Sequence, residues 1–540
     1  MFFCRRRSVP IDSIDILIWN SYNGAYFREG TRPQHLKISS SIIRPADKHS
    51  RSFKEETMEN NNLRRQLSPM HVWAIAFGCV IGWGSFINPG KKFLPNSGVA
   101  GTAIAMILGA LVMIIIAFSY AYMVPKYPTA GGEFSFAKNC FGKKMAFLCG
   151  WFLVVAYLTN VPMNSTAIGL IVDGLDGSSD YLKFGFHYCI AGFDIYAGEM
   201  LLSMLILILF GWLNMLGVKK AGILQTILSS LLVTCVFVLF VSALISSKAK
   251  GVNMAPIWGF DKAAAVAAGA TTAEIGAYAH TGSSGIAGAI LATFAIAPWA
   301  YVGFDAIPQA AEEFNFSFRK VSFIMIIAIV FGCFVYVSNN TVAAAALESW
   351  PDRVMAGEWV LLVAAEELLG GFGKLLIGLG VSCAVLSGIM GFYLASSRLM
   401  YSMSREGYLP KWFGEVDAKY GTPKNAILFC VIISLSGPIL GREALGWFVD
   451  MSAIGASIGY FFTCASTLIT ARKSGDGTAF LKAMAWTGVV FSLAFMVLQL
   501  IPIPGLSGVH FGKESYLMLV IWVLIGLAFY FKQRKWFSEG

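Results

Sequence analysis

The sequence predicts an all-α integral membrane protein with 12 transmembrane helices, and two observations support this fold class. Hydrophobic residues make up 56% of the 540 residues and charged residues only 13%, whereas soluble domains carry about 25% charged residues. A helix that crosses a bilayer needs about 20 mostly apolar residues. Twelve stretches meet or nearly meet this length: 69–94, 99–123, 145–171, 200–217, 223–247, 285–314, 321–347, 373–403, 425–440, 446–471, 480–502 and 516–532.

Residues 1–68 precede the first apolar stretch and differ from the rest of the chain. They are polar and basic and show no stable hydrophobic period. We expect this segment to be disordered and cytoplasmic. Its apolar run at 11–20 is too short and too acidic for a signal peptide. Met58 is an alternative start of translation, in which case residues 1–57 would not belong to the native protein.

The loops between the apolar stretches indicate the orientation in the membrane. Lys and Arg are more numerous in the loops that face inward if both termini are cytoplasmic. Positive charge favours the cytoplasmic side, so we expect a multi-pass protein of the cell membrane with both termini cytoplasmic. Residues 356–370 have the pattern of an amphipathic helix on the outer surface. Because the loops explain the net charge of +10, we expect no nucleic-acid partner.

The ten Cys and six His do not indicate a metal centre or a disulfide framework. Most Cys lie inside apolar stretches and no CxxC pair occurs, which is typical of small apolar side chains. The His residues lie near the ends of the stretches or in loops, and no nucleophile and base are paired within the stretches. We therefore expect no bound metal, no cofactor and no enzymatic activity.

The first and sixth apolar stretches are interrupted. The run AFGCVIGWGSFIN (76–88) contains three glycines, each of which lowers helix stability by about 1 kcal/mol relative to alanine. In the sixth stretch Pro298 removes a backbone donor, and Gly303 adds freedom. Paired interruptions in two halves of a chain indicate an inverted-repeat transporter. We expect five helices in each repeat, at 69–247 and 285–471, and two additional helices at 480–533.

The interruptions predict a binding site because backbone groups without hydrogen bonds cannot face lipid. Freed N–H groups at a half-helix attract an anion such as a carboxylate. Freed carbonyls at the other half-helix attract an ammonium group or a cation. An alternative for Gly78 and Gly82 is that small residues let two membrane helices pack closely.

Five motifs in order resemble the amino acid–polyamine–organocation (APC) superfamily of transporters, across residues 69–533. They are GCVIGWGSF (78–86), PTAGGEFSFAKNCFG (128–142), WAYVGFDAIPQAAEE (299–313), ASSRLMYSMSREGYLP (395–410) and FVDMSAIGASIGY (448–460). The resemblance implies a LeuT-type fold and alternating access. It also implies a ligand held between the first and sixth helices.

The resemblance further implies which groups hold the substrate. Three N–H groups of the first break would meet the substrate carboxylate: those of Gly82, Trp83 and Gly84. Three carbonyls of the sixth helix would meet the substrate amine: those of Trp299, Ala300 and Val302. Trp299 also matches the position at which relatives place an aromatic ring that closes over the substrate. Asn164, in the third stretch, adds a polar group to the pocket.

Trp83 departs from the family pattern, because relatives carry Ser or Thr between these two glycines. An indole side chain at this position either narrows the pocket or points away from it. A second departure follows the sixth helix, where EEFNFSFRK (312–320) lacks the usual proline. These departures leave the geometry of the carboxylate subsite open.

Six ionisable residues are candidates for ion coupling or gating, since charge within a membrane is costly: Glu133, Asp305, Glu312, Glu313, Arg398 and Asp450. Each acid would either pair with Arg398 or Arg405, or carry a proton. For the two adjacent glutamates a solvated acid at a helix end is the simpler interpretation. The two aspartates lie deeper and favour a structural hydrogen bond or a gate.

The coupling ion, H⁺ or Na⁺, is not fixed by the sequence. The fifth stretch has Leu232 where some proton-coupled relatives carry a lysine, so exchange or coupling through an acid stays open. We predict a secondary transporter (permease) for an amino acid, and a neutral one, because no charged residue is aimed at a substrate side chain. The alternatives are an amine or polyamine transporter, an amino acid exchanger, and a non-transporting nutrient sensor. The expected partners are the small-molecule substrate and the lipid bilayer, and the oligomeric state is unknown.

Overall fold

A computed structural model of the chain describes residues 63–176, 181–190, 193–441, 444–502 and 510–532. The first part of the chain contains these helices: α3 (Pro69–Val80), α4 (Gly84–Asn88), the π-helical turn η1 (Pro89–Phe93), α5 (Leu94–Lys126), α6 (Gly132–Phe141), α7 (Lys143–Leu158), α8 (Asn160–Asp176), α9 (Ala197–Met215), α10 (Val218–Ile245), α11 (Lys262–Ala267), α12 (Gly282–Phe294), α13 (Ala297–Tyr301) and α14 (Ala306–Gln309). The second part contains α15 (Val321–Ala345), α16 (Trp350–Met355), α17 (Val360–Leu369), α18 (Gly371–Arg405), α19 (Lys424–Ser434), α20 (Ser436–Leu440), α21 (Ala444–Ser474), α22 (Ala479–Leu500) and α23 (Lys513–Lys532).

The structure confirms a mainly helical membrane protein. Ten helical segments of the described chain are long and apolar enough to cross a bilayer. Two shorter apolar segments, Pro69–Val80 and Lys424–Leu440, coincide with the start of the first predicted stretch and with the ninth. The segment Gly84–Lys126 joins the rest of the first stretch to the second. The count of 12 spans and the inverted repeat stay predictions.

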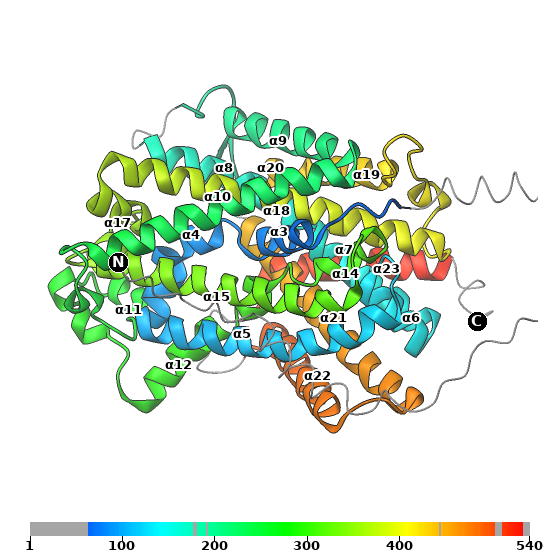
Figure 1. Cartoon of the computed structure of the whole chain (residues 1–540). Coiled ribbons are helices and arrows are strands. Elements are labelled where there is room, and N and C mark those ends of the chain that lie inside the picture. Colours follow the sequence, from blue (N-terminus) through cyan, green and yellow to red (C-terminus); the bar gives the residue numbers. More distant parts are fainter. Residues whose placement is uncertain (1–62, 177–180, 191–192, 442–443, 503–509, 533–540) are drawn as a thin grey trace, which may run out of the picture.

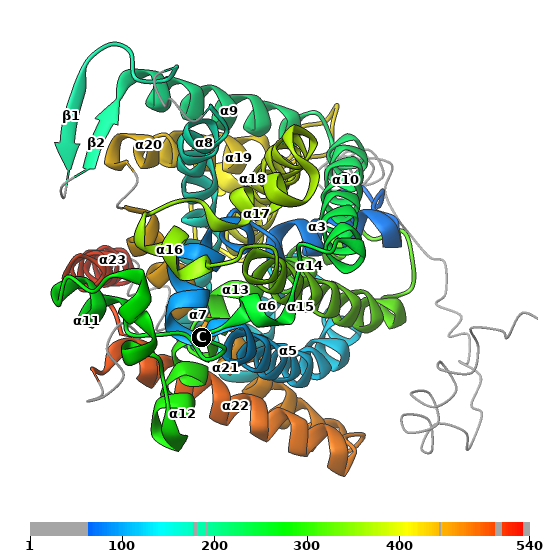
Figure 2. The same ribbon diagram turned by 90° about the vertical axis from the view of Figure 1, so that its left-hand side faces the viewer.

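The long helices run side by side and surround the two interrupted ones. Figure 1 shows them from the side, and Figure 2 looks along the bundle, with α3 and α13 near its centre. The helix α3 packs against α10, α15 and α18, and α13 packs against α5 and α21. The interrupted helices are therefore enclosed by other helices, as a polar break in a membrane requires.

Two outer elements complete the described fold. The strands β1 (His187–Ile190) and β2 (Phe193–Tyr196) form an antiparallel hairpin that the sequence did not predict, with His187 paired to Tyr196. The hairpin projects from the bundle next to α9 (Figure 2). The helix expected at 356–370 is present as α17, and its apolar face is buried against α15 and α18.

The first break separates α3 from α4. The Ser68 hydroxyl caps the start of α3 by accepting a hydrogen bond from the His71 N–H. The helix ends at Val80 because Ile81 adopts an extended conformation, and a new helical turn begins after Trp83. Gly82 therefore lies in non-helical backbone, as the glycines in this run predicted.

The second break lies at Gly303, one of the two interruptions that the sequence analysis named in this stretch, and not at Pro298, the other. Pro298 is at the start of α13, where a missing N–H costs a helix little. The chain leaves the helix after Tyr301, and Gly303 adopts a left-handed conformation with φ 132°. A Cβ atom at Gly303 would lie 2.6 Å from the Val80 nitrogen. Glycine is required here because the two breaks touch at this point.

The packed chain begins before the predicted boundary at residue 68. Leu67 is buried and forms a parallel β-bridge with Phe314. The N–H groups of Gln66 and Leu67 both donate to the Glu313 carbonyl at 2.9 Å. The short segment before α3 is therefore fastened to the segment after α14. Residues 1–62, which include the questioned residues 1–57, lie outside the described part.

The contact between the breaks predicts that Gly303→Ala destabilises the protein. The substitution forces a strained φ and a clash with backbone, and we expect a loss of about 3 kcal/mol. Gly288→Ala in α12 is the matched control, because a Cβ there meets nothing within 4 Å. The measurement is thermal unfolding of the detergent-solubilised protein followed by tryptophan fluorescence. Equal melting temperatures for the two variants would contradict close contact of the breaks.

Candidate functional site

A small cavity lies between the two breaks. Its lining comes from both breaks and from α8, α15 and α18: Cys79, Val80, Gly82, Trp83, Asn160, Met163, Asn164, Trp299, Val302, Tyr336 and Phe392. The lining includes five of the predicted substrate-binding residues: Gly82, Trp83, Asn164, Trp299 and Val302. Gly84 and Ala300 are their neighbours in the chain. The structure thus brings the predicted residues together around one space.

The first break leaves backbone N–H groups without a backbone partner beside this cavity. The Ile81 N–H still bonds to the Phe77 carbonyl at 2.9 Å. The next three N–H groups, those of Gly82, Trp83 and Gly84, donate no backbone hydrogen bond within the described residues. Two of these residues line the cavity. Free N–H groups in succession at the start of a helical turn form an anion site.

The second break presents carbonyl groups. The Trp299 carbonyl accepts a hydrogen bond from the Val302 N–H at 3.2 Å. The carbonyls of Ala300 and Val302 accept none in the part of the chain that the structure describes. Of the three carbonyls predicted to meet an amine, two are therefore available. Carbonyl oxygens at a helix C-terminus carry partial negative charge and attract a cation.

Two indole rings meet at the cavity. The ring centroids of Trp83 and Trp299 are 6.1 Å apart and both side chains are nearly buried. Trp83 therefore points into the pocket, which decides between the two alternatives left open by the sequence. Its Nε1–H is buried without a partner in the described structure. A side chain at Gly84 would collide with the Trp299 ring, so this glycine makes room for the indole.

Asn164 brings an unpaired acceptor to the first break. Its Nδ2 donates to the Asn160 carbonyl at 2.8 Å, while its Oδ1 is buried without a partner in the described residues. A Cβ at Gly82 would lie 3.3 Å from this oxygen, so the oxygen faces the break. An unpaired buried polar atom costs about 1–3 kcal/mol. This cost is typical of a site that a polar ligand completes.

The packing alternative holds for Gly78. A Cβ there would lie 2.8 Å from the Ser387 Cβ and would also collide with the Gln225 amide. The sequence analysis missed Gln225, which lies on α10 and donates to the Ala74 carbonyl at 3.2 Å and to the Ser387 carbonyl at 3.1 Å. This single amide ties α3 to α18. The signal in the sequence for this contact was a glutamine inside an apolar stretch.

The interpretation of Glu313 as a solvated acid was wrong. Its carboxylate is fully buried and forms two hydrogen bonds with Arg398, at 3.0 and 3.1 Å. The sequence could not show this because the pair joins positions 85 residues apart. Glu312, the adjacent acid, is only partly buried and pairs with Arg405, whose side chain is 42% exposed. Each glutamate thus pairs with an arginine, as one alternative from the sequence had it, and a gating role for these pairs stays a prediction.

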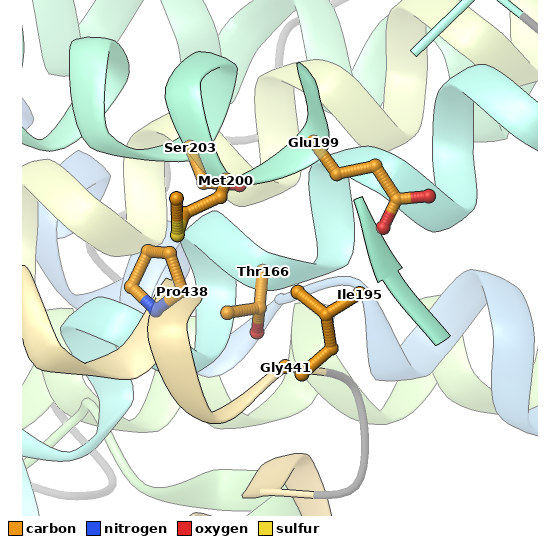
Figure 3. Close-up of a pocket in the computed structure, with 7 residues that line it drawn as sticks. All are labelled: Thr166, Ile195, Glu199, Met200, Ser203, Pro438 and Gly441. Atoms are coloured by element: carbon orange, nitrogen blue, oxygen red, sulfur yellow. The ribbon is translucent and has the colours of Figure 1, made fainter. Parts of the chain in front are cut away.

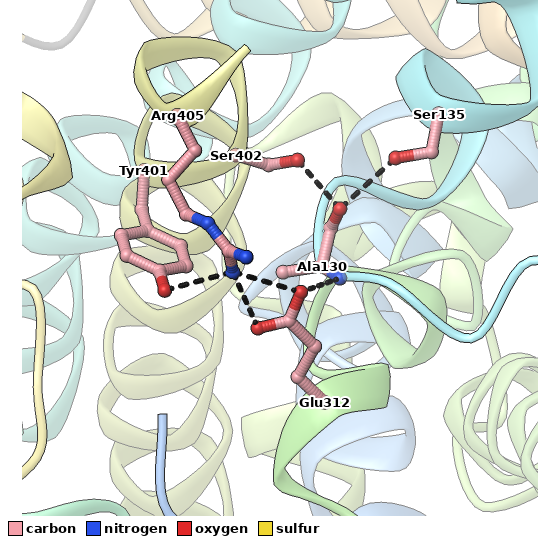
Figure 4. Close-up of polar contacts among 6 residues, drawn as sticks. All are labelled: Ala130, Ser135, Glu312, Tyr401, Ser402 and Arg405. Carbon is pink, nitrogen blue, oxygen red and sulfur yellow. Dashed lines mark hydrogen bonds and ion pairs between the residues drawn. The ribbon is translucent and has the colours of Figure 1, made fainter. Parts of the chain in front are cut away.

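The loop before α6 is hydrogen-bonded to Glu312 and to α18. Figure 4 shows Glu312 between Arg405 and the Ala130 N–H, which donates at 3.2 Å. The Ala130 carbonyl accepts from the hydroxyls of Ser402 at 2.6 Å and Ser135 at 3.0 Å. The glycines that follow, Gly131 and Gly132, have φ of 92° and 40°. Their left-handed turn delivers the next residue, Glu133, into the interior.

The remaining acids do not pair with arginine. Glu133 accepts hydrogen bonds from Tyr120 at 2.7 Å and from Gln309 at 2.5 Å. Asp305 accepts from Tyr157 at 2.9 Å. The sequence analysis missed these three partners, whose signal was a polar group inside an apolar stretch.

Asp450 lies apart from the other candidate acids. It accepts a hydrogen bond from the Ser515 hydroxyl at 2.6 Å. The structural hydrogen bond expected for this aspartate is therefore present.

A second small cavity lies between α8, α9, β2 and α20 (Figure 3). Its lining is Thr166, Ile195, Glu199, Met200, Ser203, Pro438 and Gly441. Neither break contributes to it, and it contains none of the predicted substrate-binding residues. The described residues contain no group of three or more His, Cys, Asp or Glu that could hold a metal. The central cavity is therefore the candidate site.

Comparison with known proteins identifies a family for this chain. Residues 67–527 match the model of a family described as amino acid permease. An uncharacterized transporter of Rhizobium meliloti is 26% identical over 88% of this chain and 94% of its own length. The large neutral amino acids transporter small subunit 2 of Homo sapiens is 26% identical over 69% of this chain, and the cationic amino acid transporter 3 of Arabidopsis thaliana is 25% identical over 79%. The chain spans 64% and 65% of the length of these last two relatives.

The adjacent glutamates predict a sharp difference between two identical substitutions. Glu313→Gln leaves the Arg398 charge buried and unpaired, and we expect a loss of about 3–5 kcal/mol. Glu312→Gln breaks a partly exposed pair and should cost about 1 kcal/mol or less. Thermal unfolding of both variants in detergent measures the difference. A small shift in the Glu313→Gln variant would contradict a buried ion pair at this position.

Proposed function

Since the chain belongs to the amino acid permease family, we propose that it carries a neutral amino acid across the membrane by alternating access. Its family and its relatives are permeases and transporters, so this chain is a transporter and not an enzyme. The substrate would occupy the central cavity, and we propose that both chain termini lie in the cytoplasm. The predicted 12 spans with two inverted repeats are part of this proposal.

One observation carries the proposal. Gly82 and Trp83, whose N–H groups donate no backbone hydrogen bond in the described residues, and Val302, whose carbonyl accepts none, line one cavity. An amino acid zwitterion has one group for each: its carboxylate accepts from the N–H groups and its ammonium donates to the carbonyls. The free Asn164 Oδ1 and Trp83 Nε1–H add one acceptor and one donor. These pairs would offset the cost of removing the zwitterion from water.

The cavity favours a substrate with a neutral side chain. Relatives of this chain are named for neutral and for cationic amino acids, so their names alone do not decide the charge of the substrate side chain. No charged side chain is among the described residues that line the cavity. A charged substrate group would therefore be buried without a partner, which is unfavourable by several kcal/mol. Aromatic and apolar side chains instead suit an apolar substrate side chain.

Alternating access is supported by the contacts of the segment that follows α14. The Glu313–Arg398 pair and the bridge from Leu67 to Phe314 join the segment after α14 to α18 and to the segment before α3. These contacts lie beyond the second break along the chain. We propose that they part when the cavity opens toward the cytoplasm and re-form when it closes.

Transport is tested by uptake of radiolabelled L-alanine, L-leucine and L-phenylalanine into proteoliposomes that contain the full chain. We expect uptake above that of protein-free liposomes, and inhibition by an excess of the same unlabelled amino acid. Binding without flux would favour a sensor, which is the alternative of another class. Uptake of polyamines but of no amino acid would favour an amine transporter. Uptake only with internal amino acid present would identify an exchanger.

Trp83 predicts the size limit of the substrate. Because this indole fills part of the cavity, Trp83→Ser should improve binding of larger amino acids relative to L-alanine by about tenfold or more. A thermal-shift titration with L-alanine and L-phenylalanine measures this ratio. Trp212→Ser on α9 is the control, since Trp212 is 53% exposed and lies outside the cavity. An unchanged ratio in the Trp83→Ser variant would place this ring outside the substrate site.

A further inference from the structure

Two carboxyl groups are buried side by side without a basic partner in the described part of the chain. Glu133 on α6 and Asp305 in the second break are both fully buried. The Tyr157 hydroxyl lies between them, 2.9 Å from Asp305 Oδ2 and 3.3 Å from Glu133 Oε1. A hydroxyl carries a single proton, so it donates to only one of the two carboxylates at a time.

The groups that hold the pair are neutral. Glu133 accepts from the Tyr120 hydroxyl on α5 and from the Gln309 amide on α14. Asp305 Oδ1 accepts from the Gly303 N–H at 2.7 Å. These donors orient the carboxyl groups, but they do not supply the positive charge that two buried carboxylates need.

The other titratable groups around the pair do not supply this charge either. They come from α3, α7 and α21, and they are two thiols and a phenol: Cys79, Cys149 and Tyr460. The helix α18 also packs against α6, but its Arg398 is committed to Glu313 through two hydrogen bonds. Within the described residues the two acids therefore have only each other and neutral groups.

One bound proton resolves this arrangement. Burying an ionised carboxylate without a cation is unfavourable by several kcal/mol, and a second carboxylate nearby adds repulsion. Burial raises the pKa of the Glu133 carboxyl above its ordinary value, and the charge on Asp305 raises this pKa further. Two such groups exchange protons as a coupled pair.

We propose that Glu133 and Asp305 form the proton site that couples transport to a proton gradient. The inference rests on the proposed function, because it assigns the coupling ion to the same transporter. The proton binds as an O–H bond on one carboxylate and leaves to water when that bond breaks. Tyr157 moves it between the two acids by giving its own proton to one while accepting the proton of the other.

The position of the pair connects the substrate cavity to the cytoplasmic side. Asp305 fixes the Gly303 N–H, and Val302, one residue earlier, lines the cavity. A movement of the second break as substrate binds therefore changes the surroundings of Asp305. Glu133 follows the turn at Ala130, which is attached to the partly exposed Glu312. Displacement of this turn exposes Glu133 to water, so the proton can leave on that side.

The test uses the full chain in liposomes that contain a pH-sensitive dye, with the membrane potential held at zero. Radiolabelled L-alanine, L-leucine and L-phenylalanine are supplied in two modes, which are uptake driven by an inward proton gradient and counterflow with the same amino acid inside. One coupled proton and a gradient of one pH unit support about tenfold accumulation. We expect wild-type protein to accumulate substrate and acidify the lumen. Glu133→Gln should lose both effects and keep counterflow.

Glu366→Gln on α17 is the matched control, because Glu366 is exposed and lies outside both the cavity and the buried pair, and it should behave as wild type. Absence of uptake in both modes would overturn the proposed function and this inference with it. Counterflow with no effect of the gradient and no acidification would overturn the inference alone. Acidification by Glu133→Gln at the wild-type rate would overturn it as well. If this variant does not fold, Asp305→Asn and the wild-type dye signal decide between these outcomes.

Discussion

A backbone N–H or carbonyl that lacks a hydrogen bond cannot face lipid, and the arrangement of this molecule follows from that constraint. Both interrupted helices leave such groups free, so both must be enclosed by other helices. The two breaks also touch each other, because Gly303 has no side chain to separate it from Val80. The unbonded groups of opposite polarity are thereby held around one cavity rather than two separate ones.

The charged groups lie at increasing distance along the chain from the neutral cavity. Along the chain, the second break contains Asp305 and is followed by Gln309 and then by the ion-paired Glu313. The lining of the cavity is neutral, the next acids are buried without a cation in the described structure, and only the pairs beyond them contain arginine. The residues that would recognise substrate are thus connected by a few turns to those that would bind a proton and those that would close the inner side.

The sequence predicted the helical stretches, the first break and five of the eleven residues that line the cavity, because these depend on local composition and on motifs. Of the two interruptions it named in the sixth stretch, Gly303 is the break, whereas Pro298 fits the first turn of α13. The sequence analysis missed the burial of Glu313 and the partners of Glu133, because these depend on segments far apart in the chain. The sequence left two directions open for the Trp83 ring, into the pocket or away from it. The contact of this ring with Trp299, which Gly84 leaves room for, selects the pocket.

The central claim is that the free N–H groups of the first break bind the carboxylate of an amino acid. A structure of the full chain in a lipid nanodisc with bound L-leucine tests this claim most directly. We expect the substrate carboxylate at hydrogen-bonding distance, about 3 Å, from the Gly82 and Trp83 nitrogens. A carboxylate bound elsewhere, for example in the cavity beside Glu199, with the N–H groups of the break bonded to protein atoms, would contradict the account.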